Sequence, residues 1–106
     1  MNFEIDKKQV FASTAGKDFD QAKQTVFLLH GSGLSHIVWS LTEQFLSNKD
    51  LNILSLDLPG HGNSEGPCID SIEKIADWIE SVRLFLKTEK VSICLLYTSP
   101  SPRDED

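Results

Sequence analysis

The fold is decided by residues 26–34, VFLLHGSGL, in which four apolar residues run directly into a glycine-rich turn. A short apolar run without polar alternation is typical of a strand covered on both faces, as in the centre of a parallel sheet. Gly31 and Gly33 then give the backbone the freedom that a tight turn needs. We therefore predict a buried central strand that ends at His30 and turns at once into the next element.

The segments on either side alternate between strand and helix patterns. After the turn, apolar residues recur at helical spacing, with Ser35 as the predicted N-cap. Asp70 and Glu73 have the spacing of a capping box and predict the start of a second helix. The helical stripes are Ile37, Val38, Leu41 and Phe45, then Ile72, Ile75, Ala76, Ile79, Val82 and Leu86, and the predicted strands are 3–5, 9–13, 26–29, 53–57 and 91–93. This order predicts an α/β fold in which an antiparallel strand pair leads into a mostly parallel sheet with crossover helices.

A second motif, DLPGHGNS at residues 57–64, follows the strand predicted at 53–57. Pro59 ends that strand because proline lacks the backbone donor that a sheet needs. The two motifs in this order resemble the α/β-hydrolase superfamily, in which an HGxG segment follows the third strand and a DxxGxGxS loop follows the fourth. The resemblance covers residues 1–93, and it implies the N-terminal part of an α/β-hydrolase fold.

The resemblance also implies roles for individual residues. In the superfamily, the loop after the third strand supplies one backbone donor of the oxyanion hole, and by motif position this donor is the N–H of Ser32. Acyl transfer builds negative charge on a carbonyl oxygen, and each fixed N–H donor stabilises that charge by about 3 kcal/mol. The implied substrate-binding residues are Gly31, Ser32, Gly33 and Leu34, and the implied structural residues are His30, Asp57, Gly60, Gly62 and Ser64.

No catalytic nucleophile, acid or base is identified in the sequence. Residues 62–66, GNSEG, spell the nucleophile-elbow pattern, but prolines on both sides separate Ser64 from the strand and the helix that an elbow requires. The superfamily's base lies near the C-terminus, so His30 is interpreted as a structural residue that bonds neighbouring backbone. By the same reasoning, His36 is interpreted as a helix-surface residue and His61 as a loop residue. The elbow itself is expected directly after residues 91–93.

The chain continues differently at that point. Residues 94–104, CLLYTSPSPRD, resemble the translation of a transposon-type adapter used to prepare sequencing libraries, which implies that the reading frame was lost near Ile93 or Cys94. The alternative is a genuine flexible Ser-Pro tail. Two prolines keep Ser99 and Ser101 from helical geometry, so neither is expected to replace the nucleophile. We therefore divide the chain into residues 1–93, the N-terminal portion of a hydrolase domain, and residues 94–106, a non-native tail.

Composition narrows the class of protein further. The 106 residues are 40% apolar and 25% charged, with a net charge of −6, which is typical of a soluble globular segment. The chain has neither an apolar run of ~18 residues nor a secretory signal, so the expected location is the cytoplasm. The acidic balance argues against nucleic acid or membrane as a partner. Cys68 and Cys94 form neither a disulfide framework nor a metal site, and no cofactor or metal is expected.

These features predict a truncated hydrolase whose parent would cleave an ester, amide or related bond of a small molecule by nucleophilic acyl transfer. The chain itself is expected to be inactive. One alternative is a parent with an aspartate nucleophile, of the epoxide hydrolase or dehalogenase type, or a lyase of the same fold. The other is a non-catalytic binding protein on this fold. Because the last strand would lie at the edge of an incomplete sheet, an aggregation-prone or partly molten product is expected.

Overall fold

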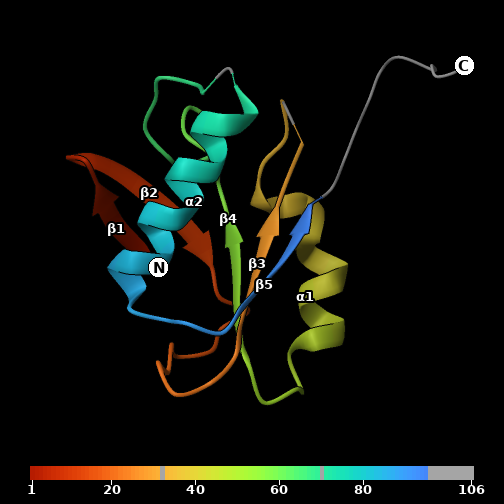
Figure 1. Ribbon diagram of the computed structural model, residues 1–106. Helices are drawn as coiled ribbons and strands as arrows, with labels where there is room; N and C mark the ends of the chain where they lie inside the picture. The colour runs from red at the N-terminus through yellow and green to blue at the C-terminus, as the bar shows by residue number, and fades with distance from the viewer. Residues whose placement is uncertain (32, 70, 96–106) are drawn as a thin grey trace, which may run out of the picture.

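The computed structural model describes residues 1–31, 33–69 and 71–95, which form a five-stranded sheet with helices on both faces (Figure 1). The strands are β1 (Asn2–Ile5), β2 (Lys8–Ser13), β3 (Thr25–Leu29), β4 (Asn52–Leu56) and β5 (Val91–Leu95). The helices are the short 3₁₀ helix η1 (His36–Trp39), α1 (Ser40–Leu46) and α2 (Ile72–Leu86). The predicted α/β fold is confirmed.

The sheet has the strand order β1-β2-β4-β3-β5. β1 and β2 form an antiparallel hairpin whose turn residues, Asp6 and Lys7, both have positive φ, as a two-residue turn of this twist requires. β2 joins β4 antiparallel through Ala12 and Ser13. β3 lies between β4 and β5 and is parallel to both, so the chain enters the sheet as a strand pair and continues it as a parallel sheet.

The two central strands, β3 and β4, are buried along their whole length, as their apolar runs predict. Alternate side chains point to opposite faces of a strand, so each strand contributes to two cores. The core under α2 includes Phe27, Leu29, Leu54, Leu56, Val82 and Leu86, and the core under η1 and α1 includes Val26, Leu28 and Ile53 with Trp39 and Leu46 packed against them. The carboxyl ends of both strands are thereby fixed at one edge of the sheet.

The first predicted helix forms, but a different face of it covers the sheet. Ser35 caps it as expected, accepting a hydrogen bond from the N–H of Ile37, and the first turn is 3₁₀. Trp39 and Leu46 pack on the sheet, whereas the apolar stripe that predicted the helix is exposed, with Leu41 79% accessible. The apolar periodicity correctly predicted a helix. Because apolar residues occur on both of its faces, the periodicity did not determine which face contacts the sheet.

The N-cap of the second predicted helix lies one residue later in the chain than predicted. Ser71, and not Asp70, is the N-cap of α2: its hydroxyl accepts a hydrogen bond from the N–H of Lys74 at 3.1 Å. The capping box between Asp70 and Glu73 was therefore wrong, and Asp70 itself lies outside the described residues. Of the predicted stripe, only Val82 and Leu86 are buried, because the second half of α2 carries the contact with the sheet.

β5 forms one edge of the described sheet. It runs two residues past Ile93, so Cys94 and Leu95, the first residues of the predicted tail, belong to this strand. The remainder of that tail, residues 96–106, lies outside the described part of the chain. Within the described ranges, no helix has the length and apolar character needed to cross a membrane.

Candidate functional site

The first motif forms a tight turn at the carboxyl end of β3. The N–H of Leu34 donates to the carbonyl of Gly31 at 3.1 Å, which closes the turn. Gly33 has φ of +80°, a conformation that a side chain makes unfavourable, although a Cβ at this position would meet nothing within 4 Å. Ser32, the residue predicted to donate to an oxyanion, lies outside the described residues, so its role stays a prediction.

His30 anchors the start of this turn from inside the protein. His30 is 1% exposed, and its ring bonds two backbone groups: Nδ1 lies 2.7 Å from the carbonyl oxygen of Gly31, and Nε2 lies 2.9 Å from the nitrogen of Leu58. A carbonyl needs a donor and an N–H needs an acceptor, so Nδ1 carries the proton and Nε2 is unprotonated. Burial lowers the pKa of the His30 imidazole, which favours this neutral form.

This arrangement predicts that acid weakens the fold through His30. Between the lowered pKa of the folded chain and the usual pKa, the unfolded chain binds the extra proton, so stability falls as pH falls, by up to about 1.4 kcal/mol per pH unit. His30→Gln keeps an amide donor and acceptor but removes the titration. We expect its free energy of unfolding, measured in urea from about pH 7.5 to about pH 5.5, to fall less steeply than that of the wild type. Parallel slopes would contradict the lowered pKa of His30.

Asp57 connects the second motif to the segment that follows the first. Its side chain is fully buried, and Oδ1 accepts from the backbone N–H of His36 at 2.6 Å. The His36 ring contributes Nδ1 at 3.0 Å from both carboxylate oxygens, and the N–H of Asn63 donates to Oδ2 at 2.8 Å. His36 was predicted on the helix surface, and this was wrong: its ring turns inward because the buried carboxylate needs donors.

Ser64 holds the second motif onto β2. Its hydroxyl donates to the carbonyl of Asp57 at 2.7 Å and accepts from the N–H of Phe11 at 2.9 Å. Both partners are backbone groups, so no base is placed to activate this hydroxyl as a nucleophile. The ring of His61 bonds the carbonyl of Pro59 at 3.0 Å and lies 5.1 Å, centroid to centroid, from the ring of His30.

Two glycines of this loop have positive φ and close neighbours. A Cβ on Gly62 would overlap the carboxylate of Asp57, and a Cβ on Gly60 would lie 2.5 Å from Sγ of Cys68. The loop therefore wraps directly around Asp57, which only glycine permits.

The two motifs thus meet at the carboxyl edge of the sheet. Hydrogen bonds hold the turn at residues 31–34 on both sides. Before it, the His30 ring accepts from the N–H of Leu58, and after it, the N–H of His36 donates to Asp57. Such an arrangement can present backbone donors in a fixed geometry. The described residues include no serine or cysteine that is hydrogen-bonded to a histidine ring, and no group of three or more side chains that could hold a metal ion. The pairing of His36 with Asp57 is the contact that the sequence interpretation missed.

Known proteins match this architecture. The alpha/beta hydrolase family model matches residues 26–97, and the chain belongs to that family. A comparison with curated proteins found no match.

Several solved structures share the fold. Cfl2 from Burkholderia cenocepacia has a TM-score of 0.73 and 18% identity, over 89% of this chain and 31% of that chain. Epoxide hydrolase A from Mycobacterium thermoresistibile has a TM-score of 0.72 and 16% identity, over 90% of this chain and 30% of that chain. The enol-lactonase from Burkholderia xenovorans has a TM-score of 0.71 and 22% identity, over 91% of this chain and 36% of that chain. The chain thus spans about a third of these structures, and at such identities the likeness establishes the fold.

Proposed function

We propose that the chain is the N-terminal part of a hydrolase that cleaves an ester, amide or related bond of a small molecule by nucleophilic acyl transfer. The observation that carries this proposal is the glycine turn at the end of β3, tied at both ends to the loop after β4. Backbone donors held in advance stabilise a developing oxyanion without reorganisation at the moment of reaction. On motif position, the N–H of Ser32 would be such a donor, with the substrate carbonyl placed against Gly31, Gly33 and Leu34.

The chain alone is proposed to be inactive. Ser64 bonds backbone on both sides, and the three histidines bond either backbone or Asp57, so no nucleophile and base are paired within the described ranges. Nucleophilic acyl transfer requires these groups together. The parent protein, on this proposal, is cytoplasmic, has no nucleic-acid or membrane partner, and carries its nucleophile, acid and base beyond residue 93.

A hydrolysis assay tests the inactive state directly. We expect the purified 106-residue chain to hydrolyse 4-nitrophenyl butyrate no faster than its Ser64→Ala variant, because Ser64 does not act as a nucleophile. Turnover that is lost in Ser64→Ala would overturn both the inactivity and the structural role of Ser64. Circular dichroism of both proteins serves as the control, because Ser64→Ala also removes two hydrogen bonds of the loop.

The nucleotide sequence around codon 94 tests the parent's chemistry. An adapter sequence there would establish the lost reading frame, and the unbroken gene would then show the residue at the elbow. Serine in that position supports acyl transfer, whereas aspartate favours the epoxide hydrolase or dehalogenase type. An elbow with neither would favour a binding protein on the hydrolase fold.

A further inference from the structure

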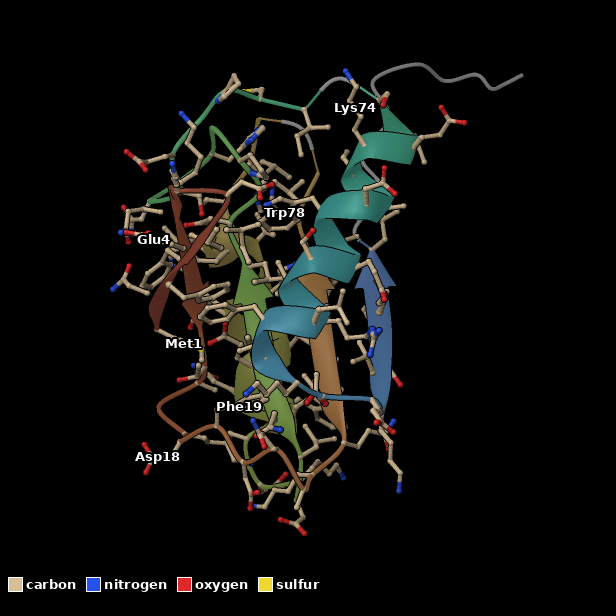
Figure 2. The ribbon with its side chains drawn as sticks, turned by 60° about the vertical axis from the view of Figure 1, so that its left-hand side comes forward. Met1, Glu4, Asp18, Phe19, Lys74 and Trp78 are labelled. Carbon is tan, nitrogen blue, oxygen red and sulfur yellow. The ribbon has the colours of Figure 1, made fainter. Side chains whose placement is uncertain are left out.

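Two histidine rings pack together where the loop after β4 meets the turn after β3. Both segments lie at the upper end of the sheet, beyond the carboxyl ends of β4 and β3 (Figure 2). The ring centroids of His30 and His61 are 5.1 Å apart, and the ring planes are tilted by 52°. The His30 ring joins the turn to the loop by accepting from the N–H of Leu58, whereas the proposed function gives His61 no role. A second titratable ring therefore lies against the ring that connects the two motifs.

The two rings differ in what a second proton would break. Nδ1 of His30 donates to the carbonyl of Gly31, so a proton on Nε2 would remove the bond to Leu58. Nδ1 of His61 bonds the carbonyl of Pro59 and therefore carries a proton, so Nε2 of His61 can take a second proton while that bond stays intact. His30 is buried and His61 is only half-buried, and burial disfavours the charged form of an imidazole. Acid therefore charges His61 before it charges His30.

We propose that His61 is a positioning residue: its positive charge keeps the His30 ring neutral in acid, and so keeps the turn after β3 hydrogen-bonded to the loop after β4. A charged ring with its centroid 5.1 Å away repels a second positive charge on His30, and partly buried charges are screened less than charges in water. Without this charge, the bond between His30 and Leu58 would be lost at a higher pH. The role rests on the proposed function, in which the turn presents the oxyanion donor.

The other groups that face His30 act in both directions. Burial is the main cause of the lowered pKa of His30, and the charge of His61 lowers this pKa further. The hydrogen bond to the carbonyl of Gly31 and the negative charge of Asp57 raise the pKa of His30, whereas a charged His36 lowers it. Among the charged side chains, His61 has a larger effect on His30 than Asp57 or His36 has. Removal of the His61 charge is therefore the substitution that acts most directly on the His30 ring.

An acid titration of the 106-residue chain, followed by NMR of the imidazole nitrogens, tests the proposal. The spectra report whether Nε2 of His30 carries a proton, and the amide signal of Leu58 reports the bond between the two residues. His61→Gln removes the charge, and we expect the midpoint pH of His30 protonation to rise by about half a pH unit or more. His61→Lys restores a positive charge without an imidazole, so its midpoint should lie below that of His61→Gln.

Lys90→Gln is the matched control, because it also removes one positive charge, but at the start of β3, where the Lys90 carbonyl accepts from the N–H of Thr25 at 2.8 Å. Its midpoint should equal that of the wild type. A midpoint in His61→Gln that is equal to or below that of the wild type overturns the proposal. So does an equal shift in His61→Gln and His61→Lys, which would mean that the imidazole acts through packing alone. His61→Asn replaces His61→Gln if the latter loses its circular dichroism. These readouts record protonation and not turnover, so their failure is distinct from a failure of the proposed hydrolase function.

Discussion

Replacement of Asp57 by alanine should cost about 3 to 5 kcal/mol of folding free energy, because it removes a buried, charged acceptor and the hydrogen bonds made to it. The carboxylate accepts from two backbone N–H groups, those of His36 and Asn63, and from the His36 ring. The Asp57 side chain is fully buried, so water does not screen the carboxylate that accepts these bonds. A loss of this size is a large part of the ~5–15 kcal/mol that stabilises a typical domain.

Urea unfolding followed by circular dichroism, at equal chain concentration, measures this loss. Asp50→Ala is the matched control: it also removes a carboxylate from an ion pair, here with Lys23, but the Asp50 side chain is 86% exposed. Exposed pairs are screened by water, so this variant should lose less than about 0.5 kcal/mol. Equal losses in the two variants would show that Asp57 does not hold the two motifs together.

His36→Ala separates the contribution of the imidazole from that of the backbone. The variant removes the ring bond at Nδ1 but keeps the backbone N–H that donates to Oδ1 at 2.6 Å. We therefore expect a smaller loss than in Asp57→Ala, about 1 to 2 kcal/mol. A loss as large as that of Asp57→Ala would assign the anchoring to the His36 side chain alone.

The central strands were predictable because burial on both faces is visible in the sequence itself. Residues 26–29 and 53–56 are nearly continuous apolar runs, and such runs cannot be stable at a surface. The positions of the two motifs followed from these strands, since the carboxyl ends of adjacent parallel strands lie at one edge. The class of fold and the location of the candidate site were therefore both readable before the structure.

Contacts between residues that only the folded chain brings together could not be predicted from the sequence in this way. Asp70 and Ser71 are neighbours and both are good N-caps, so only the path of the loop decides that Ser71 caps α2. His36 and Asp57 are 21 residues apart, and nothing in the sequence paired them, so His36 was interpreted as a helix-surface residue. Its inward position results from the need of a buried carboxylate for donors, a requirement that arises only after β3 and β4 are paired.

The replacement of Gly62 by alanine should cost about 3 kcal/mol, from two separate causes. Gly62 has φ of +51°, a conformation that is strained by ~1 kcal/mol or more for a residue with a Cβ. In addition, the new Cβ would overlap the carboxylate of Asp57, and overpacking of this kind costs ~1–3 kcal/mol. The carboxylate has no easy escape, because His36 and Asn63 hold it from two directions.

Gly16→Ala is the control that separates these two causes in the same urea experiment. Gly16 also has positive φ, +75°, but a Cβ there would meet nothing within 4 Å, so this variant reports the backbone strain alone, about 1 kcal/mol. The excess loss in Gly62→Ala then measures the overlap with Asp57. In the double variant Gly62→Ala with Asp57→Ala the overlap is removed, so the two losses should sum to more than the observed loss. Strict additivity would mean that the loop moves away from Asp57 when Gly62 is replaced, and that the close wrapping of the loop is not what holds the turn after β3 in place.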